Sequence, residues 1–334
     1  MAETLLLSGL LAFIITFLVT PKAISFFKKI NLTAPDAHKK NKPLVARGLG
    51  VPVFIGIFSS ISAIIFIQTF ILKSSGVTIP LLAGLLTLTI ITASGFIDDL
   101  MTIKDKADYK ENENGFRLKQ WLKPLLVLPA VIPLMVIAAG VSTINIPFIG
   151  VVNFGIFYPL VLVPIAIFGA ANMVNLLEGL NGTATGMGII YSGMLGLYAA
   201  VHGRYIAAVF AFSTFGALLA AWHFHKTPAK IHAGDSLTYL LGAILAIIAI
   251  LGNLEKAALI ASIPFFIEFA LKLRGKLKKD TIGYVLPNGN ITSRYNKIYS
   301  IPHIWMIGGE FKEKTIVYLL MLLELIFCFL IWLV

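Results

Sequence analysis

Polar side chains recur at every third position in an otherwise apolar stretch, FGAANMVNLLEGLNGTATGMG, and they are Asn172, Asn175, Glu178 and Asn181. Residues three apart on a helix are neighbours on one face. Carboxylate and amide oxygens suit Mg²⁺, which usually keeps several waters and shares substrate phosphates. The glycines that follow Glu178 would let the backbone approach a ligand closely. The stretch therefore indicates a site for phosphate chemistry.

Acidic residues are scarce in this chain, and two further motifs place them where apolar runs begin or end. Asp98 and Asp99 end one run in ASGFIDDL, and Asp235 precedes another in KIHAGDSLTYLLG. Taken alone, each motif also fits a solvated helix end or a hydrogen bond between helices. Polar groups at membrane depth are costly and tend to mark function. Three separate segments that bring acids or amides to one membrane face therefore favour a functional site.

The elements that must position these residues are membrane-spanning helices. Hydrophobic residues make up 58% of the chain, charged residues 13%, and the mean hydropathy is +0.89. A spanning helix needs roughly 20 mostly apolar residues. Runs of this kind lie at 4–20, 49–71, 78–97, 122–140, 154–174, 184–201, 204–222, 236–252, 257–273 and 315–333. We predict an all-α polytopic membrane protein, one domain over 1–334 with about ten transmembrane helices, although short connections after the fifth run leave nine or eleven open.

Basic residues predict the orientation of these helices. Successive loops between the predicted helices lie on alternate sides of the membrane. Of the 27 lysines and arginines, all but Lys73, Arg204 and Lys256 fall in loops on the same side. Cytoplasmic loops carry the excess of Lys and Arg, so both termini are expected outside and the active site on the cytoplasmic face. The net charge of +11 is then mainly a topology signal, and we expect no nucleic-acid partner. The hydrophilic segment 274–314 is expected to form a small cytoplasmic subdomain with a hairpin at GYVLPNGNITSRY.

Several classes of protein are disfavoured by motifs that the sequence lacks. There is no GxxxxGK[ST] loop of a P-loop nucleotidase and no His-Glu-x-x-His of a zinc protease. The lone cysteine, Cys328, allows no intramolecular disulfide and no cysteine-based metal site. The first apolar run has no basic n-region and no cleavage site, so we expect a retained helix instead of a signal peptide.

The motifs GFIDDL, NMVNLLEGLNG and AGDSLTYLLG, in this order, resemble those of the polyprenyl-phosphate N-acetylhexosamine-1-phosphate transferases. The resemblance covers nearly the whole chain. It implies a Mg²⁺-dependent enzyme that transfers GlcNAc-1-phosphate, or a similar HexNAc-1-phosphate, from UDP-GlcNAc to a polyprenyl or dolichyl phosphate and releases UMP. This reaction would be the first step of lipid-linked glycan assembly. The resemblance also suggests a homodimer, in the cell membrane of a prokaryote or the endoplasmic reticulum membrane of a eukaryote.

The resemblance assigns roles by position. Asn175 and Asp235 match the metal ligands, and Asp98 and Asp99 match a catalytic pair beside the metal and the acceptor phosphate. Lys123 is the best match for a catalytic lysine that contacts phosphate, with Lys119 as a near rival. The positions matched to substrate binding are Asn172, Glu178, Gly179, Asn181, Arg274, Lys276 and His303.

Two departures from the bacterial members of this superfamily refine the expected donor. Glu178 stands where the bacterial pattern has Asp, and only His303 stands where the bacterial muropeptide transferase has three histidines. The resemblance is therefore closest to the dolichol-linked archaeal and eukaryotic branch, with UDP-GlcNAc as donor. The alternative is a secondary transporter of an anionic solute, which would have inverted repeats and binding groups near mid-membrane. A non-catalytic membrane subunit would leave the acidic sites unexplained.

Overall fold

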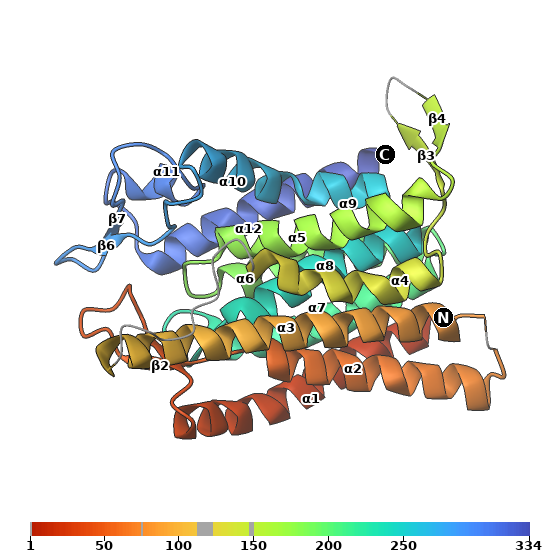
Figure 1. The fold of residues 1–334 in the computed structure, drawn as a ribbon, viewed down its shortest axis with the longest axis horizontal. Helices are drawn as coiled ribbons and strands as arrows, with labels where there is room; N and C mark the ends of the chain where they lie inside the picture. The colour runs from red at the N-terminus through yellow and green to blue at the C-terminus, as the bar shows by residue number, and fades with distance from the viewer. Residues whose placement is uncertain (1, 75, 112–122, 147–149) are drawn as a thin grey trace.

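The computed structural model describes residues 2–74, 76–111, 123–146 and 150–334, and its helices lie side by side in one bundle (Figure 1). Among the described residues, eight helices are long and apolar enough to cross a membrane. They are α1 (Ala2–Lys29), α2 (Gly50–Phe66) with its π-helical continuation η1 (Ile67–Ile71), α3 (Thr78–Glu111), the π-helical segment η3 (Tyr158–Leu162) with α5 (Val163–Leu177), α6 (Thr183–Val201), α7 (Tyr205–His225), α8 (Gly234–Gly252), and α12 (Glu313–Leu330) with η4 (Ile331–Leu333). The predicted class, an all-α polytopic membrane protein, is confirmed.

Two of the predicted spans, 122–140 and 257–273, correspond to interrupted helices. They are the 3₁₀ segment η2 (Lys123–Val131) with α4 (Ile132–Val136), and α9 (Glu255–Ala261) with α10 (Ile263–Arg274). Proline lacks a backbone N–H and its ring clashes with the preceding turn, and Pro133 and Pro264 lie in the first turns of α4 and α10. The count of ten spans and the orientation stay predictions. Both chain ends do lie at the same end of the bundle, as an even number of crossings requires (Figure 1).

Helix α8 lies in the interior of the bundle and contacts α2, α3, α5 and α7. Small residues let membrane helices approach closely, and at Gly242 of α8 a Cβ would clash with the backbone of Ala170 and Ala171 in α5. Near the start of α8, a Cβ added to Gly95 of α3 would come within 2.6 Å of the Asp235 carbonyl oxygen. Backbone packing therefore fixes the first turn of α8 against α3.

A small sheet lies at the end of the bundle opposite the termini (Figure 1). Strand β1 (Thr33–Pro35) pairs antiparallel with β2 (Leu44–Arg47), and β2 pairs in parallel with β5 (Ile231–His232). The register places Arg47 opposite His232, three residues before Asp235. The sheet thus joins the α1–α2 connection to the segment that leads into α8.

Two hairpins extend from opposite ends of the bundle (Figure 1). Strands β6 (Tyr284–Val285) and β7 (Ile291–Thr292) pair antiparallel at the end that carries the β1–β2–β5 sheet, which confirms the hairpin predicted from the sequence. The short helix α11 (His303–Met306) follows it. Strands β3 (Thr143–Ile146) and β4 (Gly150–Asn153) form the other hairpin, near the chain termini.

Candidate active site

A cavity of about 250 Å³ lies beside the β1–β2–β5 sheet. Its walls come from the β1–β2 connection, the end of α5, the loop between α5 and α6, and the start of α8. The residues predicted from the sequence that line it are Asn175, Glu178, Gly179, Asn181 and Asp235. Segments far apart in the chain thus meet in one place, as the motifs had indicated.

The loop between α5 and α6 is shaped by a glycine and by an acid. Gly182 has a φ of +105° directly before α6, a conformation that glycine adopts without steric cost. Glu178 Oε2 accepts a hydrogen bond from the Ala184 N–H at 2.9 Å, a first-turn group that has no partner inside the helix. Burial raises the pKa of Glu178 to about 8, while 20% of the side chain stays exposed at the cavity wall. Glu178 is therefore mostly neutral at pH 7 and helps to cap α6.

Asp99 holds the first turn of α8. Its carboxylate accepts hydrogen bonds from the backbone N–H groups of Asp235 at 2.8 Å and Ser236 at 3.1 Å, and from the Ser236 hydroxyl at 2.8 Å. The first N–H groups of a helix lack internal partners and favour negative charge, so Asp99 caps α8 from a neighbouring helix. Gly234, with a φ of +72°, lies against the same carboxylate, which a Cβ would strike. Asp99 is fully buried, and it positions Asp235 without lining the cavity.

Arg47 connects the sheet to both acids. Its Nε donates a hydrogen bond to Asp99 Oδ1 at 2.7 Å, and its Nη2 lies 3.4 Å from Asp235 Oδ1. Burial opposes the charged form, but the carboxylates of Asp99 and Asp235 outweigh it and raise the pKa of Arg47. With 23% of its side chain exposed, Arg47 lines the cavity as a permanent cation. A guanidinium in this position can donate charge-assisted hydrogen bonds to phosphate oxygens.

The oxygen donors at the cavity fit Mg²⁺. Asn175 Oδ1 accepts a hydrogen bond from the Thr238 hydroxyl at 3.1 Å and keeps a second lone pair. The carboxyl groups of Asp98 and Asp235 are close neighbours, and two carboxyl groups this close need a proton or a cation to offset their charge. Within the described residues, no three His, Cys, Asp or Glu side chains are grouped to hold a metal. A few hard oxygens from the protein, with waters and substrate phosphates, are typical of Mg²⁺.

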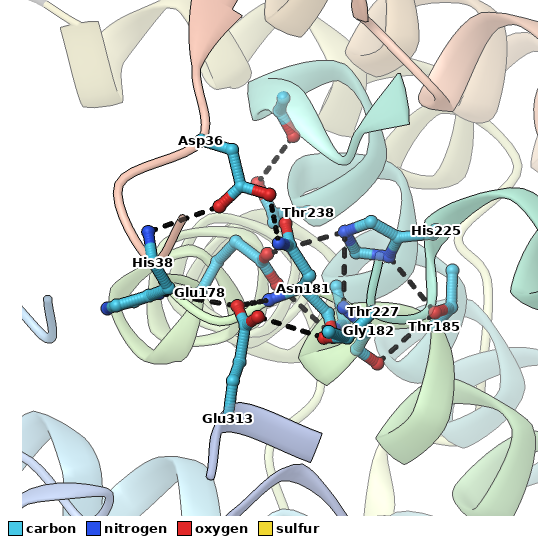
Figure 2. Close-up of polar contacts among 12 residues, drawn as sticks. Asp36, His38, Glu178, Asn181, Gly182, Thr185, His225, Thr227, Thr238 and Glu313 are labelled. Atoms are coloured by element: carbon cyan, nitrogen blue, oxygen red, sulfur yellow. Dashed lines mark hydrogen bonds and ion pairs between the residues drawn. The ribbon is translucent and has the colours of Figure 1, made fainter. Parts of the chain in front are cut away.

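Glu313, at the start of α12, organises the opposite wall (Figure 2). Its Oε1 accepts a hydrogen bond from the Asn181 backbone N–H at 2.9 Å and lies 3.3 Å from His38 Nδ1. Its Oε2 accepts hydrogen bonds from the Thr227 hydroxyl and the Lys39 ammonium, both at 3.0 Å. One buried carboxylate thus joins the β1–β2 connection, the loop before α6, the segment after α7 and the last helix.

Asp36 and His38 continue this wall towards the segment after α10. Asp36 Oδ2 accepts a hydrogen bond from Asn181 Nδ2 at 2.9 Å, and Asp36 Oδ1 accepts one from the His38 N–H at 3.1 Å. His38 Nε2 accepts a hydrogen bond from the Gly283 N–H at 3.2 Å. The predicted subdomain 274–314 therefore contacts the wall of the cavity.

Comparison with known proteins decides the family. A sequence model of glycosyl transferase family 4 matches residues 81–253. A Saccharolobus solfataricus protein, provisionally named UDP-N-acetylglucosamine–dolichyl-phosphate N-acetylglucosaminephosphotransferase, is 34% identical over 97% of this chain and 94% of its own. A Sulfolobus acidocaldarius protein with the same name is 30% identical over 98% of this chain and 94% of its own. The chain belongs to glycosyl transferase family 4.

A bacterial relative also aligns with this family 4 chain. The phospho-N-acetylmuramoyl-pentapeptide-transferase of Halalkalibacterium halodurans is 30% identical over 82% of this chain and 85% of its own. Both branches named by the sequence motifs are thus represented among the relatives. The protein is an integral, multi-pass membrane protein of this family.

Three of the residues assigned to substrate binding lie outside the cavity lining of this family 4 chain. Asn172 Nδ2 donates a hydrogen bond to the Phe168 carbonyl oxygen at 2.8 Å, within its own helix. The Arg274 guanidinium lies 5.8 Å from the centre of the Tyr299 ring. His303 is buried, and its Nδ1 accepts a hydrogen bond from the Tyr299 N–H at 3.3 Å. Burial lowers the pKa of His303 to about 4, so it is neutral at pH 7.

Of the two lysines assigned to the site, the structure describes the side chain of Lys276 alone. Lys276 is exposed just after α10, with a φ of +53°, and does not line the cavity. Lys123 begins η2, but its side chain lies outside the described residues, as does all of its rival, Lys119. The choice between these two for the phosphate contact stays a prediction.

The structure adds residues that sequence reasoning missed. They are Asp36, His38, Arg47 and His232, which line the cavity, and Glu313, which braces its wall. In the sequence, Arg47 looks like any basic residue of a loop, and Glu313 looks like any acid that precedes an apolar run. Neither context indicates a role in the site. His232 stands three positions before Asp235, and burial lowers its pKa, so a neutral ring faces the cavity. Only the position of His232 beside the Gly-Asp motif could have suggested a role.

Proposed function

We propose that this chain transfers GlcNAc-1-phosphate from UDP-GlcNAc to a polyprenyl phosphate, of dolichol type, and releases UMP. The observation that carries the proposal is the convergence of Asn175, Asp235 and Arg47 on one cavity at an end of the helix bundle. A site there can meet a lipid substrate that diffuses in the membrane and a sugar nucleotide that arrives from water. The names of the two archaeal relatives support the same donor and acceptor.

The reaction joins an oxygen of the acceptor phosphate to the phosphorus that carries GlcNAc and breaks the bond from that phosphorus to UMP. The acceptor oxygen is already ionised, so alignment and charge compensation supply most of the catalysis. Asn175 and Asp235 would hold Mg²⁺, which when bound offsets the charge of the diphosphate. Arg47, whose guanidinium lies beside Asp235, would donate hydrogen bonds to a phosphate oxygen. Asp98 neighbours the side chain of Asp235, and Asp99 fixes the backbone of Asp235. Both residues therefore help to position Asp235, the proposed metal ligand.

The proposed orientation has both termini outside and the cavity on the cytoplasmic face. The distribution of basic residues supports it. Among the described residues, the end of the bundle with the β1–β2–β5 sheet carries the basic α1–α2 connection and the β6–β7 hairpin. A cysteine in place of Asn288 should be shielded from an impermeant external thiol reagent, whereas one in place of Ser74 should react. The opposite labelling pattern would reverse the orientation.

An isotope-exchange assay tests the transfer itself. Purified protein would be incubated with Mg²⁺, radiolabelled UMP, the polyprenyl phosphate acceptor and a panel of UDP-sugars, one at a time. We expect label to enter UDP-GlcNAc alone. Label in a different UDP-sugar would identify that sugar nucleotide as the donor. No exchange with any UDP-sugar would contradict the transferase proposal and favour the alternative, a secondary transporter of an anionic solute. We also propose a homodimer, which light scattering of the purified protein would test.

A further inference from the structure

A second, smaller pocket of about 80 Å³ lies between the end of α7 and the start of α12. It is lined by Trp222, Lys226 and Thr227 from the first segment and by Lys314, Val317 and Tyr318 from the second, with Asn181 between them. We propose that this pocket binds the phosphate group of an anionic phospholipid. The proposal is separate from the transfer reaction, because neither of the predicted metal ligands, Asn175 and Asp235, nor Arg47 lines this pocket.

The charge of the pocket fits a phosphate. Lys226 and Lys314 come from different elements, and neither forms an ion pair with any residue that the structure describes. The adjacent carboxylate, Glu313, is already taken by the Lys39 ammonium and by the Asn181 N–H. Two lysines without an acidic partner leave a local excess of positive charge at the edge of the pocket. Lysine is a common binder of phosphate oxygens.

The position of the pocket favours a lipid over a solute. The span of α7 ends at His225 and the span of α12 begins at Glu313, so both lysines lie where helices leave the bilayer. The rings of Trp222 and Tyr318 are 6.4 Å apart, and these two residue types gather at the level of the lipid head groups. Val317 of α12 forms an apolar part of the pocket wall. The pocket therefore offers a phosphate site above an apolar surface that acyl chains can cover.

The pocket shares a wall with the candidate active site. Asn181 lines both cavities, and the Thr227 hydroxyl donates hydrogen bonds to Glu313 Oε2 and to the Asn181 carbonyl oxygen (Figure 2). Gly182 lies directly against Trp222, because a Cβ there would come within 3.0 Å of the ring. A bound lipid would thus contact the loop that forms one side of the active site.

Quenching of Trp222 by brominated lipids tests the proposal on the full chain in phosphatidylcholine nanodiscs that contain phosphatidylglycerol. Bromine would be placed on the acyl chains of one lipid at a time, and the Trp222→Phe variant gives the signal of the other tryptophans for subtraction. We expect brominated phosphatidylglycerol to quench Trp222 more strongly than brominated phosphatidylcholine. The preference should fall about 5-fold for each of Lys226→Gln and Lys314→Gln, since a lysine near an anionic surface contributes about 1 kcal/mol.

The matched control is Lys230→Gln with Lys312→Gln, two nearby exposed lysines that do not line the pocket. The control pair should keep the lipid preference of the wild type, and thermal unfolding would verify that every variant folds. Equal quenching by the two lipids, or an equal loss in the control pair, would overturn the proposal. Equal quenching by the two lipids, together with a rise in Tm on addition of inorganic phosphate that Lys226→Gln and Lys314→Gln abolish, would assign the pocket to free phosphate and overturn the lipid as its ligand.

Discussion

Asp99→Asn is expected to destabilise the protein, because this carboxylate holds a helix and a guanidinium together. Oδ1 accepts hydrogen bonds from Arg47 Nε and the Asp235 N–H, and Oδ2 accepts them from the Ser236 N–H and hydroxyl. An asparagine amide has only one oxygen, so its NH₂ group must face at least one N–H donor in either orientation. Removing one partner of a buried ion pair costs about 3–5 kcal/mol. Arg47 keeps some contact with water, so the lower end, about 3 kcal/mol, is expected.

Thermal unfolding in detergent measures this effect. A loss of about 3 kcal/mol lowers the apparent Tm of a protein of this size by about 5 °C or more, and the same scan rate must be used because unfolding of such proteins is commonly irreversible. Asp98→Asn is the matched control, since it makes the same change one residue earlier, at a carboxyl group that neighbours the Asp235 side chain instead of the helix backbone. We expect a clearly smaller shift in Tm for this control. If Asp99→Asn kept the wild-type Tm and lost only activity, Asp99 would be catalytic and the capping argument would be refuted.

Three further substitutions separate metal binding, protonation and donor binding. Asp235→Asn should fold normally, lose most transfer activity and need more Mg²⁺ for the remainder; wild-type activity and metal dependence in a Mg²⁺ titration would contradict the ligand assignment. Glu178→Gln should keep most activity, because a neutral acid is replaced by a neutral amide of the same size. Between pH 4.5 and about 8, folded wild type keeps a proton on Glu178 that the unfolded chain has already released, so its Tm should fall relative to the variant as pH rises through this range; parallel Tm curves would argue against this. Glu313→Gln should raise KM for UDP-GlcNAc about 10-fold with little change in kcat, because donor binding would then have to order the wall that Glu313 holds, at the cost of about one charge-assisted contact, ~1.5 kcal/mol; unchanged steady-state kinetics would remove Glu313 from the site.

Hydropathy was sufficient to predict the helices of this fold but not where they end. The run predicted at 4–20 belongs to α1, which continues to Lys29, and the run at 78–97 belongs to α3, which continues to Glu111. Both extensions contain lysines, which a search for apolar runs excludes, although they are compatible with a helix that emerges from the membrane. The interruption at 257–273 carried a local signal, Pro264, that the average over a window conceals.

The site was predictable where its residues share a motif. Asn175, Glu178 and Asn181 recur at every third position, but α5 ends at Leu177, so Glu178 and Asn181 lie in the following loop and not on one helical face. The Gly-Asp motif places Asp235 at a helix start. Arg47 could not be recognised, because its role depends on a strand pairing that brings it opposite His232. A lysine or arginine in a cytoplasmic loop is explained well enough by topology, so its sequence context alone gives no reason to look further.

The two sides of the cavity are built from different kinds of contact, and this difference has a functional consequence. On the side of Asp235, backbone packing at Gly95 and the capping contact from Asp99 hold the first turn of α8 in place. On the side of Asn181, side-chain hydrogen bonds to Asp36 and Glu313 join segments that are otherwise far apart in sequence. Packed backbone resists movement more than exchangeable polar contacts do. The Asp235 side is therefore rigid, while the Asn181 side can adjust to a bound substrate, and substitutions should lower stability on the first side and raise KM on the second.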